Sequence, residues 1–572
     1  MDAVSELFSS VDSTYLHVYI TVLRWLAPIL AGLLLFRCLK PLLTFRREPE
    51  IWAWLCMEGG KKIPVMHWEN VIGRHKRSDI VIDFPTVSRN HAVLTRYGDG
   101  SWAIWDTDSK SGVLVNGVPE TICALHPGDE ITIGGVALVF QPISAKQEKR
   151  LAQLRTHGGA IPDSFANLML LTVFQVVTCL AFLLSGGPYL SSVLLGFCGI
   201  LAAEWLLMLF YFIIRRTAFE VETLAFFLCT MGMAAIATVC PQEAGKQLIA
   251  MLLGIALFLA IGFTIRDLRR VSVLRRVAAV AGAVLLLLTL VFGTSYRGAK
   301  NWIIIGGISL QLSELVKVCF VLVGASTMDR ILNRRNLIGF IAYSVMLCGF
   351  LALMNDFGTV LIFFLSFLVI AFMRSGSIGT IGLACTSAGF AGVLALNVAP
   401  HTLRRFRTWR NIWADPYGAG YQQTRCLMCV ASGGLLGLGP GQGWMKNLFA
   451  ADSDVVIATL SEEWGLILAV MMVLSVLGLA VFALRSCAVA RSSFYAIGGC
   501  TAAAILLVQV MLNALGTVDV LPFTGVTFPF VSNGGSSMMG AWGLLAFIKA
   551  TDTRQNASFA VSVQKSGGEE DA

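Results

Sequence analysis

Charged residues are scarce in this chain of 572 residues. Asp, Glu, Lys and Arg together make up 14% of it, whereas hydrophobic residues make up 56%. A soluble globular protein carries roughly 25% charged residues, so water cannot be the solvent for most of this chain. The composition therefore excludes an ordinary soluble protein and predicts a polytopic, all-α membrane protein.

The chain also lacks a disulfide framework. Its 14 cysteines lie mostly inside apolar runs, where cysteine behaves as a small hydrophobic residue. Cys426 and Cys429 have the spacing of a redox or zinc pair, but no second pair or neighbouring histidine accompanies them. We therefore expect no metal or redox role for this pair. The net charge of +8 is expected on cytoplasmic loops, so we predict no nucleic-acid partner.

Apolar runs that approach the length of a membrane span recur along the chain. A spanning helix needs about 20 mostly apolar residues, and about thirteen runs qualify. No cleavable signal peptide is evident, and the first run is long enough to be an anchor. The runs lie at residues 17–39, 165–185, 188–214, 218–240, 247–264, 274–293, 312–328, 336–354, 357–373, 377–398, 461–485, 492–515 and 531–550.

Basic residues between the runs predict the orientation. If the spans alternate, the basic clusters near residues 46, 215, 266–276, 330–335, 374 and 485–491 share one side, which is expected to be cytoplasmic. The loops 294–311, 399–460 and 516–530 then face outward. Loop 399–460 still carries Arg404, Arg405, Arg407 and Arg410. Basic residues on the outer side indicate an anionic ligand or, alternatively, headgroup anchoring.

Residues 50–143 differ from the rest of the chain. Short alternating stretches such as Asp79–Ile82 are separated by turn signals such as Asn116-Gly117 and Pro127-Gly128. This pattern predicts a small all-β sandwich, and the orientation places it in the cytoplasm.

Three motifs in this segment resemble the forkhead-associated (FHA) family, a phosphothreonine-binding sandwich. They are Gly73-Arg74, then Ser88-Arg89-Asn90-His91, then Ser111-Gly112 followed by Asn116-Gly117. An Arg guanidinium and a Ser hydroxyl on neighbouring loops can hold a phosphate through charge-assisted bonds. The resemblance implies a partner protein phosphorylated on threonine by a Ser/Thr kinase pathway.

The resemblance also implies a role for each residue. His91 is expected to brace the phosphate loop, and Gly73 and Gly117 to be structural. Ser111 stands where the family often has Asn, and a sandwich kept only for shape or docking is the alternative. The implied phosphothreonine site comprises Arg74, Ser88, Arg89, Ser111 and Asn116, with Asn116-Gly117 also forming a turn.

Polar clusters interrupt the apolar background from residue 218 onward. Charge at membrane depth is costly, so each cluster is a candidate functional site. The string Pro529–Ser537 and the placement of Asp454 eight residues before Glu462-Glu463 resemble the SEDS family (shape, elongation, division and sporulation; RodA/FtsW/SpoVE-like). That family implies a peptidoglycan glycosyltransferase that uses lipid II, works with a class B penicillin-binding protein, and lies in the bacterial plasma membrane.

The resemblance implies about ten core spans, with three additional spans before them. The expected domains are an N-terminal transmembrane anchor at 1–49, a cytoplasmic FHA sandwich at 50–143, a linker with two additional helices at 144–217, a SEDS core at 218–552 with its large outer loop at 399–460, and a disordered cytoplasmic tail at 553–572.

By the same resemblance, Asp454 is the catalytic base or a metal ligand. Departure of a diphosphate needs Arg, Lys or a divalent cation such as Mg²⁺ or Mn²⁺.

We expect Glu462 and Glu463 to be structural, at a helix start capped by Ser461. The implied substrate-binding residues are Arg404, Arg405, Arg407, Glu314, Lys317, Gln422 and Ser532.

Some positions depart from the family pattern. Asn301 stands where Arg is usual, Asn533 where Tyr is usual, and Ala450-Ala451 where Pro-Glu is usual. Two other functions therefore remain open. A transporter (flippase) of a lipid-linked precursor would also use many spans with polar groups at midplane. A non-catalytic membrane scaffold would use the FHA segment for recruitment.

Overall fold

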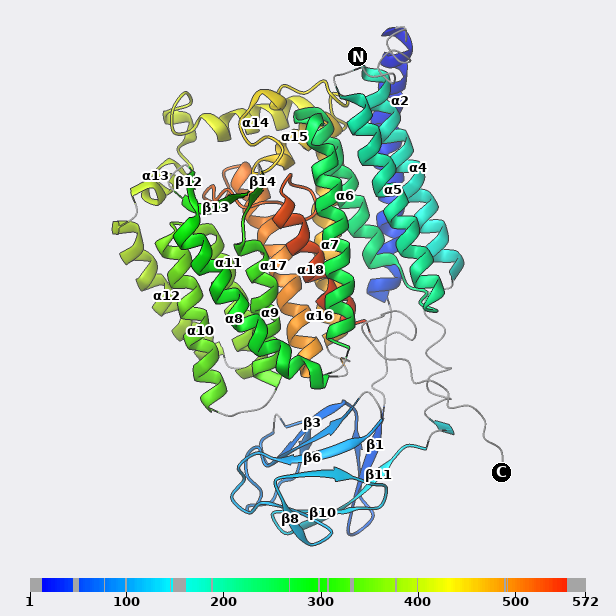
Figure 1. Cartoon of the computed structure of the whole chain (residues 1–572), viewed down its shortest axis with the longest axis vertical. Coiled ribbons are helices and arrows are strands. Elements are labelled where there is room, and N and C mark those ends of the chain that lie inside the picture. The colour runs from blue at the N-terminus through cyan, green and yellow to red at the C-terminus, as the bar shows by residue number, and fades with distance from the viewer. Residues whose placement is uncertain are drawn as a thin grey trace.

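The computed structural model describes residues 13–44, 51–144 except 77, 98 and 99, 146–147, and 161–552 except 187–188, 267, 297–298, 306–307, 330–333, 376–377, 399, 488–489 and 491. The tail expected at 553–572 lies outside the described residues. A long helical bundle occupies one end of the molecule and a small β domain the other (Figure 1).

Each apolar run predicted from the sequence contains a long helix. A run of this length in lipid can satisfy its own backbone only as a helix. In chain order these helices are α2 (Ser13–Thr44), α4 (Ile161–Ser185), α5 (Leu190–Ile213), α6 (Glu220–Val239), α7 (Ala244–Thr264), α8 (Leu268–Phe292), α9 (Ser313–Asp329), α10 (Arg334–Leu353), α11 (Phe357–Ser375), α12 (Ile378–Val398), α16 (Leu466–Cys487), α17 (Ser493–Thr517) and α18 (Gly535–Ala550).

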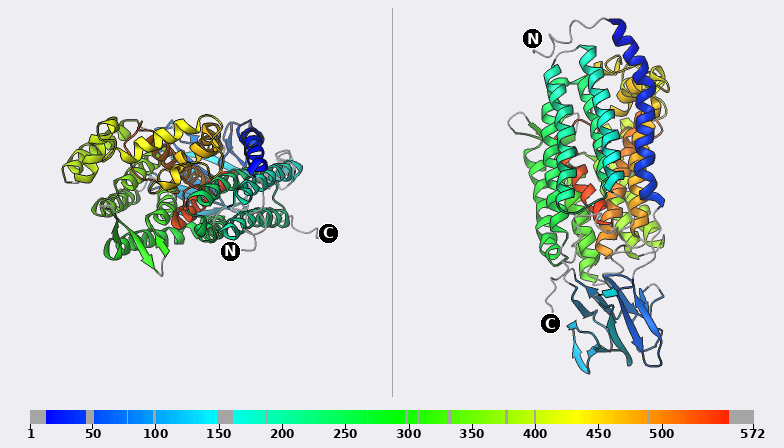
Figure 2. Two further views of the ribbon diagram at one scale, coloured as in Figure 1. Left: turned by 90° about the horizontal axis from the view of Figure 1, so that it is seen from above. Right: turned by 90° about the vertical axis from the view of Figure 1, so that its right-hand side faces the viewer.

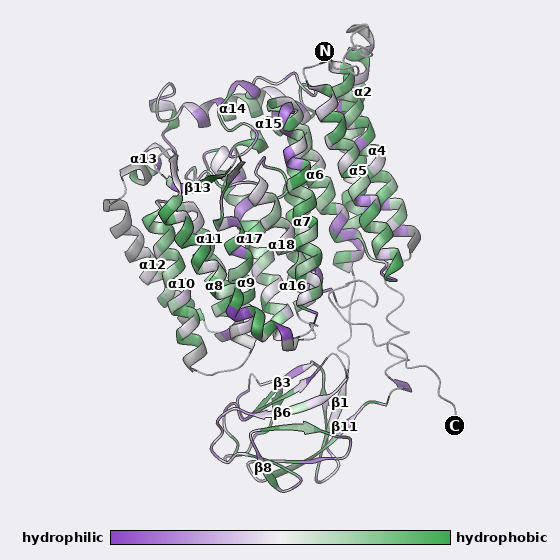
Figure 3. Cartoon of the chain, in the orientation of Figure 1, coloured by the Kyte–Doolittle hydropathy of each residue, from purple (hydrophilic) through white to green (hydrophobic). Residues whose placement is uncertain are grey.

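Among the described residues, 9 helices are long and apolar enough to cross a membrane. The total of about thirteen spans stays a prediction, because α9 and α18, for example, are shorter. Helices such as α7, α8 and α11 are hydrophobic along most of their length (Figure 3). The mostly helical membrane architecture predicted from composition is confirmed.

Helices α2, α4 and α5 stand beside the rest of the bundle (Figure 2) and pack against α6, α7 and α16. Polar contacts fix them there. The fully buried Glu204 of α5 accepts a bond of 2.7 Å from Gln175 of α4, which also contacts Thr230 of α6. A buried carboxylate without partners would be costly in the bundle, so these contacts join the additional helices to the core.

The end of the bundle away from the β domain carries shorter elements between α12 and α16 (Figure 1). These are α13 (Pro400–Thr408), α14 (Tyr421–Gly433) and α15 (Val456–Trp464). The loop 294–311 forms a small antiparallel sheet of β12 (Thr294–Tyr296), β13 (Ala299–Ile305) and β14 (Ile308–Leu310), which the sequence did not predict.

The β domain is a sandwich of two sheets around its own apolar core, as predicted. One sheet has the order β2-β1-β11-β10-β7-β8 and the other β4-β3-β5-β6-β9. The strands are β1 (Ala53–Met57), β2 (Lys62–Val65), β3 (Glu69–Gly73), β4 (Ile80–Val81), β5 (Ala92–Arg96), β6 (Trp102–Asp106), β7 (Val113–Val115), β8 (Val118–Glu120), β9 (Ile122–Leu125), β10 (Glu130–Ile133) and β11 (Val136–Pro142).

The β domain touches the bundle at the connection between α16 and α17. Glu69, the first residue of β3, accepts hydrogen bonds from the hydroxyls of Ser492 at 3.1 Å and Ser493 at 3.0 Å. Ser492 is also the N-cap of α17, and His67 lies 3.2 Å from the Ala490 carbonyl. The domain therefore contacts the end of the bundle away from α14 and α15 (Figure 1).

We predict that this end of the bundle is cytoplasmic, because the basic loops lie there. A reporter fused after Gln141 should be active inside the cell, and one inserted near Gly443 should be active outside. Paired alkaline phosphatase and fluorescent-protein fusions measure both. Activity of the two fusions on the same side would contradict the predicted topology.

Candidate functional site

Asp454 lies in an irregular segment just before α15. Ala450 adopts a positive φ of 57°, and its carbonyl accepts bonds from the backbone N–H groups of Ser453 and Val455. The resulting turn leaves the Asp454 side chain half-buried. Opposite it lies Gly525, where a Cβ atom would stand 3.3 Å from the Asp454 Oδ2. The carboxylate is thus directly against the chain between α17 and α18.

Four consecutive backbone carbonyls hold this segment in place. The carbonyl of Ala451 accepts from the Thr459 hydroxyl at 2.7 Å, and that of Asp452 from the Asn533 backbone N–H at 2.8 Å. The next two, of Ser453 and Asp454, accept from Ser532 at 2.7 Å and Asn513 at 2.9 Å. Because each carbonyl has its own donor, four hydrogen bonds from three parts of the fold hold the backbone that carries Asp454.

The arginines of α13 divide into two groups. Arg405 donates from Nη1 to the Thr524 carbonyl at 2.9 Å, so its guanidinium contacts the residue that precedes Gly525. Arg404 and Arg407 are exposed. Trp409 donates to the Val520 carbonyl at 3.2 Å, which ties the same loop to α13. All three arginines are exposed, and the structure brings Arg405 to the same loop as Asp454.

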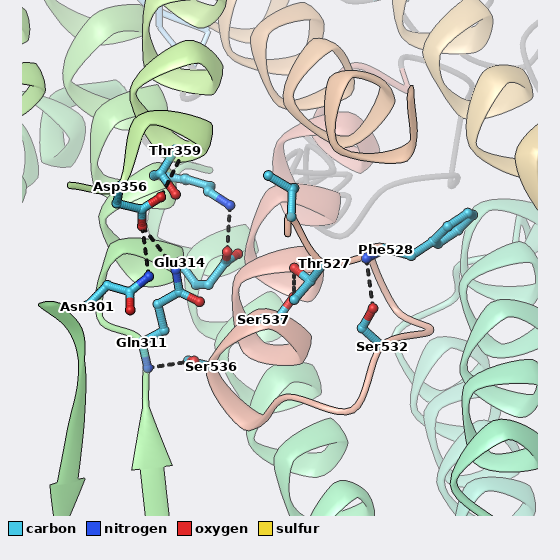
Figure 4. Close-up of polar contacts among 12 residues, drawn as sticks. Asn301, Gln311, Glu314, Asp356, Thr359, Thr527, Phe528, Ser532, Ser536 and Ser537 are labelled. Carbon is cyan, nitrogen blue, oxygen red and sulfur yellow. Dashed lines mark hydrogen bonds and ion pairs between the residues drawn. The ribbon is translucent and has the colours of Figure 1, made fainter. Parts of the chain in front are cut away.

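Ser532 and Gln422 have structural partners near Asp454. Ser532 accepts a bond from the Phe528 N–H at 2.8 Å while it donates to Ser453, and Figure 4 shows the first of these contacts. Gln422 donates to the Phe449 carbonyl at 3.2 Å. Both side chains therefore support the segments around Asp454; their predicted contact with substrate stays a prediction.

The expected position of Glu462 and Glu463 at a helix start is wrong. Helix α15 ends at Trp464, so the pair lies in its last turn, and Ser461 bonds within the helix to the Ile457 carbonyl. Glu462 accepts from the Met445 N–H at 2.8 Å.

Glu463 accepts from the Gly443 N–H at 3.2 Å and from the Thr238 hydroxyl at 2.7 Å. The two carboxylates thus hold loop 399–460 against α15 through backbone amides, and Glu463 also joins α15 to α6 through the Thr238 hydroxyl. Neither carboxylate caps a helix start.

Glu314 and Lys317 pair with each other on α9. Their charged atoms are 2.7 Å apart and both side chains are buried. Near the same helix, Asp356 accepts from Asn301 at 3.1 Å and from Gln311 at 3.3 Å (Figure 4). Asn301, which departs from the family pattern, thus binds the Asp356 carboxylate.

The predicted phosphate residues of the β domain come from neighbouring loops. Arg74 directly follows β3 and is exposed, and its Nη1 lies 3.4 Å from the Pro85 carbonyl. The Ser88 hydroxyl accepts from the Lys110 N–H at 3.1 Å, and the Ser111 hydroxyl donates to the Thr86 carbonyl at 3.3 Å. Arg89 is exposed in the same loop as Ser88.

His91 is fully buried beneath these loops. Its Nδ1 accepts from the Ser88 N–H at 3.0 Å, and its Nε2 donates to the Gly112 carbonyl at 2.9 Å. One side chain therefore joins two of the loops, as a brace would. At Gly73, a Cβ atom would overlap the Arg89 carbonyl, so the close approach of the strand and the loop requires glycine.

Asn116 does not share this end of the domain. Asn116 directly follows the last residue of β7, whereas Ser111 precedes the first residue of that strand. The two residues therefore lie at opposite ends of β7. Its amide donates to Asp129 at 3.0 Å and accepts from the Glu130 N–H at 3.0 Å. The bond from Asn116, together with one from the His126 N–H, holds the pKa of the Asp129 carboxyl below its ordinary value. The prediction that Asn116 binds phosphothreonine is corrected: Asn116 forms a turn.

Metal ligands do not gather in the described part of the chain, where no group of three or more His, Cys, Asp or Glu side chains could hold an ion. Cys426 and Cys429 pack in a small apolar cluster with Met445, Leu448 and Ala451. Their spacing reflects one face of α14, since residues three apart share a helix face.

Sequence reasoning missed Asn513 and Thr459 as supports of the Asp454 segment. Asn513 carried a usable signal, because an amide within an apolar span is costly unless it is bonded. Thr459 carried none, since a hydroxyl in a helix usually bonds to its own backbone.

Comparison with known proteins identifies two families along the chain. A family model described as "Cell cycle protein", for the FtsW, RodA and SpoVE group, matches residues 236–556, which is more than half of the chain. A model described as "FHA domain" matches residues 70–134.

Named relatives cover much of the same region. The chain is 28% identical over 327 residues to the peptidoglycan glycosyltransferase RodA of Mycobacterium tuberculosis, covering 54% of this chain and 69% of that protein. It is 32% identical over 270 residues to the probable peptidoglycan glycosyltransferase FtsW of Coxiella burnetii, covering 45% of this chain and 73% of that protein.

A solved structure shares the fold of the bundle. It belongs to a study described as "Structural coordination of polymerization and crosslinking by a peptidoglycan synthase complex", with a TM-score of 0.50, 23% identity, and coverage of 58% of this chain and 96% of that chain. From the matched families and this fold, the chain belongs to the FtsW/RodA/SpoVE (SEDS) family of membrane proteins and carries an FHA domain before its SEDS core.

Proposed function

We propose that the chain is a peptidoglycan glycosyltransferase that polymerises lipid II at the outer face of a bacterial plasma membrane, in cell elongation, division or sporulation. The observation that supports this most is that the Asp454 carboxylate faces Gly525, while the Arg405 guanidinium bonds to the carbonyl of the preceding residue, Thr524. Transfer of a glycosyl group needs a base for the acceptor and positive charge for the leaving diphosphate, and these two side chains are of the required types.

In this proposal Asp454 takes the proton from the acceptor hydroxyl. The acceptor oxygen forms a bond to the anomeric carbon while the bond from that carbon to the diphosphate breaks. The carrier leaves as undecaprenyl diphosphate, and Arg405, with the exposed Arg404 and Arg407, offsets the charge that develops on it. If a divalent cation supplies this charge instead, Asp454 is its ligand.

The proposal extends to the β domain, where Arg74, Ser88, Arg89 and Ser111 would hold a phosphothreonine on a partner protein. Charge-assisted bonds from a guanidinium suit a phosphate, and Arg74 and Arg89 are exposed. Recognition would occur on the cytoplasmic side, away from the proposed chemistry. A Ser/Thr kinase pathway would then regulate the synthase, and a class B penicillin-binding protein would cross-link its product.

Asp454→Asn should reduce glycan synthesis by about 100- to 10,000-fold, because that is the usual loss when a positioned general base is removed. Folding should be nearly unchanged, because Asn keeps the size of the side chain and the backbone carbonyl that Asn513 binds. The measurement is polymer length and yield from fluorescent lipid II, at matched protein levels and with the partner transpeptidase present.

Asp452→Asn is the matched control, since Asn still offers an oxygen to the Asn533 amide, which lies 2.8 Å from Asp452. Its effect should be much milder. Equal polymerisation by wild type and Asp454→Asn would remove Asp454 as the catalytic residue. A wild-type protein that moves lipid II between leaflets without polymerising it would support the transporter instead.

Arg74→Ala in the full-length protein should weaken binding of a phosphothreonine peptide by at least about tenfold, since a charge-assisted bond contributes about 1.5–3 kcal/mol. Fluorescence anisotropy of a labelled peptide measures the affinity. Lys62→Ala, an exposed cation on β2, is the control and should leave the affinity unchanged. Equal binding of phosphorylated and unphosphorylated peptides by wild type would refute the recognition role.

A further inference from the structure

Asn513 is one of the residues that bond the segment before α15 to the chain between α17 and α18. It lies on α17, and its side chain is buried with 2% exposure. Its Nδ2 donates one hydrogen to the Asp454 carbonyl at 2.9 Å and the other to the Val526 carbonyl at 2.8 Å. Asp454 precedes α15, and Val526 belongs to the loop between α17 and α18, so one amide joins the two.

The two carbonyls that Asn513 bridges, those of Asp454 and Val526, are close in the chain to the place where the Asp454 carboxylate faces Gly525. Val526 directly follows Gly525, where a Cβ atom would be 3.3 Å from the Asp454 carboxylate. Thr524, on the other side of Gly525, accepts the bond from Arg405. The Asn513 amide therefore links the backbone of Asp454 to the backbone of the loop that Arg405 binds.

The other donors to this segment do not have this geometry. Thr459 bonds to the Ala451 carbonyl from α15, and Ser532 joins the Ser453 carbonyl to the Phe528 N–H. These bonds do not involve Thr524 or Val526, the two neighbours of Gly525. Asn513 also projects from a helix that packs against α9, α11, α16 and α18. A side chain on a rigid element positions its partners better than one on a loop.

Few residues could replace Asn513 here. The two carbonyls require two N–H donors on a short side chain. Ser has one donor, Asp has none when ionised, and Gln is longer by one methylene. The orientation of the amide is also fixed, because a flipped amide would direct its oxygen at two carbonyl oxygens.

We propose that Asn513 is a positioning residue that holds the Asp454 carboxylate at its working distance from the Thr524–Val526 loop. The inference rests on the proposed glycosyltransferase function. Asn513 touches no reacting atom in this scheme and acts only through the backbone of Asp454 and Val526.

The first test compares Asn513→Ala with Thr517→Val in polymerisation of lipid II. Thr517 lies one turn further along α17, and its hydroxyl bonds only to the Asn513 carbonyl of its own helix. Asn513→Ala should lower kcat by about 10- to 100-fold with little change in KM, because small misplacement of a reacting group has costs of this order. Thr517→Val should retain the wild-type values.

The second test combines Asn513→Ala with Asp454→Asn. Residues that act as a unit are not additive, so the double variant should be no less active than Asp454→Asn alone. If the two losses multiply, Asn513 contributes independently of Asp454 and the proposal is overturned. Asn513→Asp, which keeps the shape without the donors, should match Asn513→Ala; wild-type kcat in Asn513→Asp would also overturn it.

A third measurement does not depend on activity. Hydrogen–deuterium exchange in residues 450–456 should be faster in Asn513→Ala than in wild type and unchanged in Thr517→Val. Unchanged exchange in Asn513→Ala would overturn the positioning role even if wild type polymerises lipid II. If wild type forms no polymer while exchange rises as expected, the glycosyltransferase proposal fails and the structural link between Asn513 and Asp454 stands.

Discussion

The region around Asp454 depends on one constraint: backbone groups that are withdrawn from water must find hydrogen-bond partners inside the protein. A helix meets this constraint by itself, whereas the irregular segments at 449–455 and 518–534 cannot. Here the carbonyls of residues 451–454 each receive a donor from elsewhere in the fold. The donors come from α15, α17 and the stretch before α18, so this irregular backbone joins three parts of the fold.

The same constraint explains the acidic pair that follows. Glu462 and Glu463 accept from the backbone N–H groups of Met445 and Gly443, and glycines at 433, 437 and 443 allow the outer loop to approach them closely. Buried carboxylates are tolerated where they receive such bonds. The signature of Asp454 and two glutamates at fixed spacing is thus one folded unit, in which the glutamates hold the loop and α15 sets their distance from Asp454.

The sequence predicted the parts of the fold that follow from local rules. Apolar runs became helices because lipid leaves the backbone no other choice, and turn pairs such as Asn116-Gly117 marked a β domain because their positive φ angles favour tight turns. The break between α15 and α16 was missed, since an apolar run does not reveal where Gly465 interrupts it. The partners of Asn513, Ser532 and Asn116 were also missed, because they lie in irregular segments or on other elements, and no spacing rule reports them.

The contact between the β domain and α17 connects strand β3 to the helix that carries Asn513. Strand β3 begins at Glu69, which binds Ser492 and Ser493, and ends at Gly73, next to Arg74. A strand of this length spans about 13 Å at ~3.3 Å per residue. A pull applied at the Arg74 end would therefore pass along β3 to the first turn of α17. That helix also carries Asn513 near its other end, so tension from the β domain would bear on a helix that ends beside Asp454.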